Sequence, residues 1–130
     1  MATARSHVFI NRPADEVWKA ITDPAGITSW FPGITGCTMN GNVRTVTTSR
    51  GTTVDEEVVT NDQSLRRFQY RIVPGLVPVE SHLGTIDVIE HGPESIVVYS
   101  TDVTPDTFGS TMQTTIDAAT KALKEHLETP

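Results

Sequence analysis

Four polar side chains are suited to act together on a small molecule: those of Arg44, Glu56, Tyr70 and Tyr99. A guanidinium can hold a carboxylate or an enolate through two parallel hydrogen bonds. A carboxylate can accept a proton or orient a hydroxyl group, and a phenol can donate a hydrogen bond to a carbonyl oxygen. These groups act together only if the chain places them on one surface, so the pairing of the strands that carry them decides the question.

The stretch from Val43 to Val103 predicts a single antiparallel meander, because runs rich in valine and threonine alternate with turn residues. A hairpin with its turn at residues 49–52 places Arg44 opposite Glu56. The loop at residues 61–64 admits two registers, and only one of them matches apolar residues to apolar residues. We therefore expect the following pairs: Val46 with Val54, Val54 with Ile72, Glu56 with Tyr70, Val58 with Phe68, Phe68 with Ile86, Tyr70 with Gly84, Val88 with Val97, and Ile86 with Tyr99. This register gathers the four polar residues on one otherwise apolar face.

Helical patterns flank the meander. The other elements are expected to be a strand at about residues 5–11, a helix from Pro13 to Asp23, a further turn at 25–30, a strand at 34–39, and a long helix from about Pro105 to Glu128. The long helix carries one apolar stripe, which contains Met112 and Ile116 and has to be buried against the concave face of the sheet. The sequence thus predicts one α+β domain over residues 1–130. In it, a curved antiparallel sheet of about seven strands wraps around the long C-terminal helix, with short helices after the first strand.

Composition argues against several classes of protein. With 130 residues, a net charge of −6 and a pI near 5.0, the chain offers no basic stripe for nucleic acid. Its single cysteine, Cys37, excludes an internal disulfide and suits the reducing cytoplasm, where we expect the protein. No run approaches the roughly 18 apolar residues of a membrane span, and no apolar signal region opens the chain. The four histidines lie on different predicted elements, so we expect no metal, and no motif indicates another cofactor.

Short motifs along nearly the whole chain follow a known order. They are the segment from Ile10 to Asp23, Trp30-Phe31-Pro32, Gly51 to Glu56, Tyr70 to Pro74, and His82 to Val88. In this order the sequence resembles the polyketide cyclase/dehydrase-like branch of the START and birch-allergen (Bet v 1-like) superfamily. The resemblance implies the helix-grip fold, with a cavity for apolar molecules such as lipids, polyketides, plant hormones or flavonoids. Tyr99 stands where the family commonly has a tryptophan and His82 where it has an aromatic residue, which implies a more polar pocket.

We interpret the inner face as one wall of a pocket that binds a small, mostly apolar or amphipathic organic molecule. Pockets of this kind usually measure roughly 300 to 1,000 Å³. Arg44 and Glu56 would supply its polar anchor, and Trp30 and Leu76 would guard its opening. The residues expected to line it are Trp30, Arg44, Glu56, Tyr70, Leu76, His82, Tyr99, Met112 and Ile116.

Purely structural roles explain some of the same side chains. Arg44 and Glu56 can simply neutralise each other across their hairpin, as buried charges must. Tyr99 can be a half-buried strand residue whose hydroxyl reaches water. His82 lies near the rim of the predicted sheet, where a backbone group can satisfy its ring. These readings stay open beside the functional ones.

Two other functions fit the sequence. A cyclase or dehydratase would use Glu56 or His82 as its base, with Arg44 or Tyr70 stabilising the enolate that forms. A protein-interaction module would have a collapsed cavity and an exposed apolar patch at residues 76–77. Since a strand edge can pair with a second copy of itself, the sequence leaves the oligomeric state open between a monomer and a homodimer.

Overall fold

The structure is a computed structural model that describes residues 1–75 and 77–130. Its elements are β1 (Ala2–Ile10), α1 (Ala14–Thr22), the 3₁₀ helix η1 (Pro24–Ser29), β2 (Ile34–Asn40), β3 (Val43–Thr48), β4 (Thr53–Asp62), β5 (Arg67–Ile72), β6 (Ser81–His91), β7 (Glu94–Thr104), the 3₁₀ helix η2 (Asp106–Phe108) and α2 (Gly109–Glu128). This order confirms the predicted succession of elements. Leu76, predicted to guard the opening of a pocket, lies outside the described residues.

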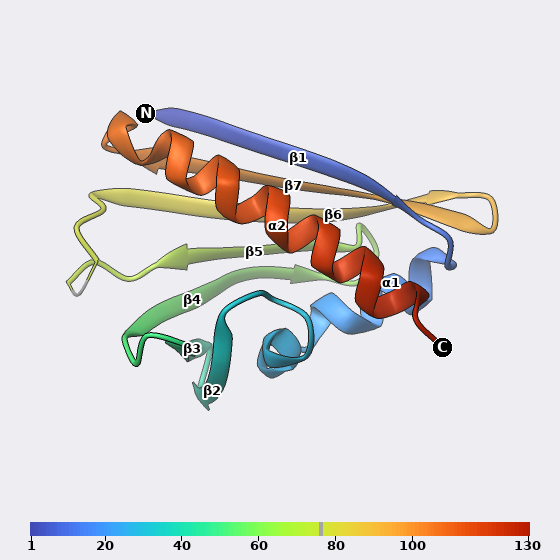
Figure 1. Ribbon diagram of the computed structural model, residues 1–130, viewed down its shortest axis with the longest axis horizontal. Coiled ribbons are helices and arrows are strands. Elements are labelled where there is room, and N and C mark those ends of the chain that lie inside the picture. The colour runs from blue at the N-terminus through green and yellow to red at the C-terminus, as the bar shows by residue number, and fades with distance from the viewer. Residues whose placement is uncertain (76) are drawn as a thin grey trace.

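Seven antiparallel strands form one sheet in the order β1-β7-β6-β5-β4-β3-β2. Strands β2 to β7 follow one another as a meander, and β1 joins the far edge beside β7. Figure 1 shows α2 running across one face of the sheet, over β6 and β7, while α1 and η1 lie toward one end. The predicted α+β helix-grip architecture is therefore confirmed.

The turn from α1 into η1 follows from local sequence. Pro13 precedes the first turn of α1, where Asp15 and Glu16 lie at the positive end of the helix dipole. The helix ends at Asp23 because a residue that precedes proline is driven out of helical geometry. The Asp23 carboxylate then accepts a hydrogen bond from the backbone N–H of Ala25 and caps η1.

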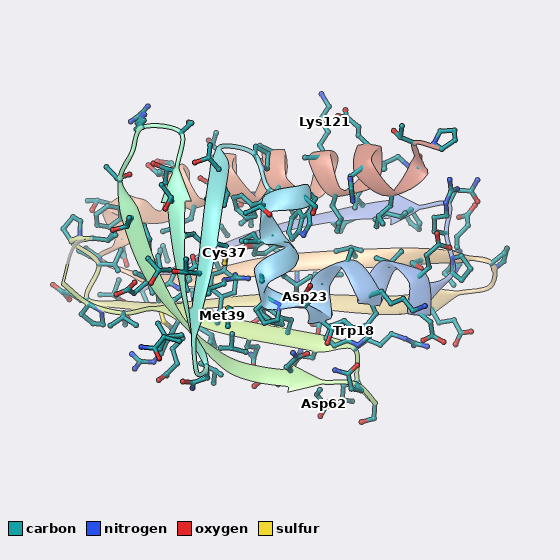
Figure 2. All side chains as sticks on the ribbon, turned by 90° about the horizontal axis from the view of Figure 1, so that it is seen from below. Trp18, Asp23, Cys37, Met39, Asp62 and Lys121 are labelled. Atoms are coloured by element: carbon teal, nitrogen blue, oxygen red, sulfur yellow. The ribbon has the colours of Figure 1, made fainter. Side chains whose placement is uncertain are left out.

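The long helix α2 buries the predicted stripe. Ile116, Ala119 and Leu123 are buried beneath it, whereas Figure 2 shows Lys121 pointing away from the sheet. The helix proper begins at Gly109, a few residues after the predicted start, because the segment before it is the separate turn η2.

Side chains of α2 form hydrogen bonds with backbone groups at the free edge of β1. The Gln113 amide accepts a hydrogen bond from the backbone N–H of Arg5 at 3.1 Å and donates one to the Arg5 carbonyl at 2.9 Å. Further along, Lys124 Nζ donates to the carbonyl of Phe9 at 2.7 Å. At Arg5 the side-chain amide bonds both the backbone N–H and the carbonyl, as a neighbouring strand would. These hydrogen bonds hold α2 against the edge of the sheet.

Most predicted strand pairs are confirmed. Arg44 lies opposite Glu56, Tyr70 lies opposite Gly84, and Ile86 is paired with Tyr99. Each of these pairs follows from a hairpin whose turn lies where the sequence predicts it.

The predicted register between β4 and β5 is wrong by two residues. Glu56 pairs with Ile72 instead of Tyr70, and Val58 pairs with Tyr70. The cause is a bulge between Val58 and Thr60, together with a longer β4. That strand ends at Asp62, whose carboxylate accepts hydrogen bonds from the next turn. Because the shift is even, Glu56 and Tyr70 still point to the same face of the sheet.

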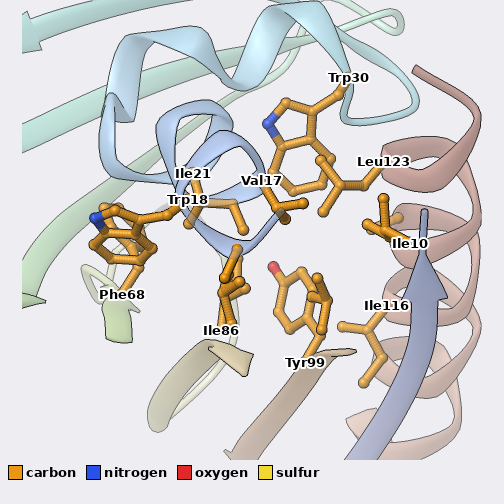
Figure 3. Packing of buried hydrophobic residues seen from close by; sticks show 14 of the residues in the cluster. Ile10, Val17, Trp18, Ile21, Trp30, Phe68, Ile86, Tyr99, Ile116 and Leu123 are labelled. Carbon is orange, nitrogen blue, oxygen red and sulfur yellow. The ribbon is translucent and has the colours of Figure 1, made fainter. Parts of the chain in front are cut away.

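Gly84 allows a close approach that the site depends on. A Cβ atom at this position would lie 2.6 Å from the ring of Tyr70, so any side chain there would displace the ring. The Tyr70 ring can therefore lie against the backbone of β6. Figure 3 shows the neighbouring core, in which Tyr99 lies near Ile86 and Ile116 beneath the helices.

Candidate functional site

One row of inward-facing residues crosses the sheet and carries most of the candidate groups. Arg44 of β3 is opposite Glu56 of β4, and Glu56 is opposite Ile72 of β5. The backbone N–H of Ile72 donates to Nδ1 of His82 on β6 at 3.0 Å, which continues the row. Four consecutive strands therefore place a guanidinium, a carboxylate, the branched alkyl group of isoleucine and an imidazole in one row.

The guanidinium of Arg44 is held on several sides. Its Nε donates to Oε1 of Glu56 at 2.7 Å, and its Nη1 donates to the carbonyl of Pro24 at 3.1 Å. Its central carbon lies 4.9 Å from the ring centre of Tyr70 and 5.3 Å from that of Phe68, within the range of cation–π attraction. The Arg44 side chain is only 5% exposed, so these contacts replace its hydration.

Burial and pairing act on Glu56 in opposite directions. Loss of water raises the pKa of this carboxyl above its ordinary value, while the charge and hydrogen bond of Arg44 lower it and offset only part of the rise. The Glu56 side chain is 12% exposed. The carboxyl group is therefore poised to hold or release a proton closer to neutrality than an exposed glutamate would.

The two tyrosines form a buried pair. Their hydroxyls are hydrogen-bonded to each other, and both rings are buried. Burial is the main cause that raises the pKa of each phenol, so both stay protonated. The Tyr99 hydroxyl thus meets Tyr70 instead of water, which contradicts the alternative of a half-buried strand residue.

A pocket of about 200 Å³ opens between the sheet and the first half of α2. It is lined by Phe31, Ile34, Val46, Thr48, Val54, Glu56, Tyr70, Ile72, Val77, His82, Thr111, Met112 and Thr115. Its walls are mostly apolar, with Glu56, Tyr70 and His82 grouped on the sheet side. It is smaller than expected from the sequence because Tyr99 and Ile116 pack solidly beneath the rest of α2.

The structure brings together some of the predicted lining residues. Glu56, Tyr70, His82 and Met112 all line the pocket. Three others lie elsewhere. Arg44 and Tyr99 line a separate space of about 10 Å³, and Ile116 belongs to the hydrophobic core.

Trp30 does not line this pocket. Its ring packs near Val17 and Leu123, as Figure 3 shows, and it is 9% exposed. The next residue, Phe31, lines the pocket instead. The sequence shows two adjacent aromatic residues at this bend, and the prediction placed Trp30 at the opening of the pocket. The packing of η1 decides which of the two rings faces the pocket, and the sequence pattern does not show it.

His82 has one defined tautomer. Its Nδ1 accepts the hydrogen bond from Ile72, so the neutral ring carries its proton on Nε2. Burial lowers the pKa of His82 to about 4, with only a partial opposing effect from Asp102. The ring lies 5.4 Å from that of Tyr70, centre to centre. At neutral pH this residue is therefore an uncharged hydrogen-bond donor.

The sequence profile of a family described as "Polyketide cyclase / dehydrase and lipid transport" matches residues 1–128. The chain belongs to this family. No curated protein matches the sequence. The resemblance noted from the motifs is thereby confirmed, and solved structures support it at the level of the fold.

Three solved structures illustrate the fold of the family. XoxI from Bacillus cereus is 25% identical with a TM-score of 0.90, and the match covers 98% of this chain and 96% of that one. A START superfamily protein from Mycobacterium smegmatis is 14% identical with a TM-score of 0.82, covering 98% of each chain. A norcoclaurine synthase variant from Thalictrum flavum, solved with a transition-state analogue, is 17% identical with a TM-score of 0.74, covering 96% and 92%.

Residues 1–75 and 77–130 contain no helix that is both long and apolar enough to cross a membrane. The same residues hold no cluster of three or more histidine, cysteine, aspartate or glutamate side chains placed to bind a metal. Burial raises the pKa of the Cys37 thiol above its ordinary value. The half-buried side chain therefore stays uncharged and packs as a small apolar group.

The pKa of His82 predicts a dependence of stability on pH. Because the folded pKa lies near 4 and the ordinary value is 6.5, the unfolded chain binds a proton between these values that the folded chain does not. The free energy of unfolding should therefore fall as pH drops from about 6.5 to 4, by on the order of 3 kcal/mol from this residue. Urea denaturation of the wild type and of His82→Asn at several pH values measures the difference.

The control is His126→Asn, which removes an exposed histidine from the last turn of α2. This variant should follow the wild-type pH curve, whereas the His82→Asn curve should be flatter in the same range. Parallel curves for the wild type and His82→Asn would contradict the buried, neutral imidazole.

Proposed function

We propose that the protein binds a small, mostly apolar organic molecule in the pocket between the sheet and α2. The observation that carries this proposal is the composition of the pocket: mostly apolar walls with a few polar groups, namely Glu56, Tyr70 and His82 of the sheet and the hydroxyls of Thr48, Thr111 and Thr115. Ligand sites typically combine apolar surface for affinity with a few placed polar groups for orientation. Family membership supports the same reading, since the family description names both polyketide chemistry and lipid transport.

The size of the pocket bears on the class of ligand. About 200 Å³ is below the roughly 300 to 1,000 Å³ usual for drug-sized ligands, so a compact molecule fits better than a long-chain lipid. We place this activity in the cytoplasm, since the single cysteine forms no internal disulfide.

Binding would be driven mainly by the apolar walls. Val46, Val54 and Ile72 of the sheet face Met112 of the helix across the pocket. A ligand that covers these side chains removes apolar surface from water, at roughly 25 cal/mol for each Å². The polar groups add orientation rather than most of the affinity.

A variant that fills the opening should abolish binding. Thr115 is exposed on α2 and lines the pocket, so Thr115→Trp places an indole across the space at little cost to folding. We expect ligand affinity to fall at least about tenfold, because the indole occupies the volume that the ligand needs. A screen of small aromatic and aliphatic compounds by native mass spectrometry, repeated on the variant, provides the measurement.

Thr114→Trp is the matched control. Thr114 is the preceding residue of the same helix, equally exposed, and does not line the pocket. The control should bind every hit as the wild type does. Hits that bind Thr115→Trp as well as they bind Thr114→Trp would place their site elsewhere and refute the pocket.

One observation favours an enzyme as the second candidate function. Glu56 lines the pocket and its pKa is raised, which suits a general base or acid near neutral pH. The other predicted partners are less suited to the chemistry of a cyclase or dehydratase. The lowered pKa of His82 makes it a weak base, and Arg44 lies behind Glu56 rather than in the pocket.

Glu56→Gln separates the carrier from the enzyme. If the protein is a cyclase or dehydratase, this variant should lose at least about a hundredfold in turnover of a β-keto substrate, because the amide cannot transfer the proton. If the protein is a carrier, ligand affinity should change by less than about tenfold. Turnover measured by mass spectrometry and affinity measured by calorimetry give the two readouts, and an active Glu56→Gln variant excludes Glu56 as the base.

The third alternative, a protein-interaction module with a collapsed cavity, has less support. The pocket is open, and Val77 is half-buried and lines it instead of standing on the surface. Leu76, the other residue of the predicted patch, lies outside the described residues.

A further inference from the structure

We propose that the pocket selects an uncharged ligand that accepts a hydrogen bond from Nε2 of His82 at one end and donates one to Glu56 at the other. A hydroxyaryl ketone or aldehyde is the chemical class that fits. The inference rests on the proposed binding function and adds to it the polarity and the charge of the ligand.

Arg44 is not available to hold an anionic ligand. Its Nε and Nη1 are bonded to Glu56 and to the carbonyl of Pro24, and two aromatic rings lie beside the guanidinium. It is absent from the lining of the pocket, and that lining contains no other arginine and no lysine among the described residues. A ligand carboxylate would therefore meet the Glu56 carboxyl with no cation in the described lining to bind it, since Arg44 is already paired with Glu56, and this is unfavourable in a site with little water.

His82 presents a fixed donor to the pocket. The backbone N–H of Ile72 occupies Nδ1, so the proton resides on Nε2. No hydrogen bond joins Nε2 to another described residue, and this nitrogen is not among their buried atoms without a partner, so it is accessible from the pocket. The ring lines the pocket and is 8% exposed. Once a ligand covers the pocket, Nε2 loses contact with water, so a ligand acceptor is needed to replace that hydrogen bond, because a buried polar group without a partner is costly.

Glu56 presents an acceptor to the same pocket. Its Oε1 receives the hydrogen bond from Arg44, while no described residue donates to Oε2. The residue lines the pocket. A ligand hydroxyl can donate to this second oxygen without disturbing the pair with Arg44.

The spacing of the two groups limits the shape of the ligand. Glu56 and His82 lie in one row with Ile72 between them, two strand spacings apart, or roughly 9.5 Å between backbones. Both side chains line the pocket, with Ile72 on the strand between them, so a ligand that bonds both groups carries its donor and its acceptor at opposite ends of its body. A benzene ring with para substituents has this form, and Phe31 and Met112 provide apolar walls for its faces.

Three probes of nearly equal size test the inference: 4′-hydroxyacetophenone, 4-ethylphenol and 4-hydroxybenzoate. The first carries both groups, the second lacks the acceptor, and the third carries a charge. For the wild type at pH 7, we expect the ketone to bind about 3- to 10-fold more tightly than 4-ethylphenol. We expect 4-hydroxybenzoate to bind at least about tenfold more weakly than the ketone. Titration of ¹⁵N-labelled protein, followed by NMR chemical shifts, gives the affinities.

Two variants assign the preference to His82. His82→Asn keeps an acceptor for the Ile72 N–H but loses the donor on the pocket side, so the ketone should lose its advantage over 4-ethylphenol. His82→Gln, with a longer amide, should restore part of that advantage. The readout is the ratio of the two affinities within each protein, because a change in the shape of the pocket acts on both probes, whereas a lost hydrogen bond acts on the ketone alone.

The possible results separate the two proposals. If the carboxylate binds as tightly as the ketone, or if the ketone keeps its advantage in His82→Asn, the inference is overturned while the pocket stands. If no probe binds, the inference is overturned, and the broader screen of small compounds decides the proposed function. If Thr115→Trp leaves the binding of all three unchanged, the proposed function fails and this inference fails with it.

Discussion

The buried pair of Arg44 and Glu56 is the constraint around which the site is built. Removing two charges from water costs several kcal/mol for each ion, and only close pairing with further hydrogen bonds can offset that cost. The chain meets this requirement by placing the two residues opposite each other across the β3–β4 hairpin, with the Pro24 carbonyl and the Tyr70 ring completing the surroundings of the guanidinium. The short helices before β2 are thus needed at the site as well as in the core.

This pairing determines the character of the pocket. Because the guanidinium is held behind the carboxylate, Glu56 lines the pocket and Arg44 does not. The other polar groups of the lining carry no charge: an imidazole, a phenol that is already bonded to Tyr99, and three threonine hydroxyls. The family fold supplies the space between sheet and helix, whereas these particular side chains give that space its polarity. Gly84 contributes by its lack of a side chain, since it lets the Tyr70 ring lie against β6.

Turn positions made much of the fold predictable from sequence, and packing limited what could be predicted of the site. The hairpin at residues 49–52 fixes the Arg44–Glu56 pair by simple counting, and alternation places Tyr70 and His82 on the same face. The bulge after Val58 could not be predicted by counting residues from a turn. Its presence depends on how far β4 continues before the Asp62 carboxylate accepts hydrogen bonds from the next turn. Face alone does not tell whether a side chain lines a pocket or lies behind it. Glu56 lines the pocket and Arg44 lies behind it, and this difference results from contacts between elements, such as that of Arg44 with the Pro24 carbonyl.

A double-mutant cycle on the pair tests the central claim most directly. Unfolding free energies at pH 7 for the wild type, Arg44→Met, Glu56→Gln and the double variant measure the coupling between the two side chains. The account predicts that Arg44→Met alone costs about 3 to 5 kcal/mol, because it leaves a buried carboxylate without its partner. The double variant should then lose less than the sum of the two single losses, by more than about 1 kcal/mol. Additive losses would show that Arg44 and Glu56 do not depend on each other, and would contradict the account.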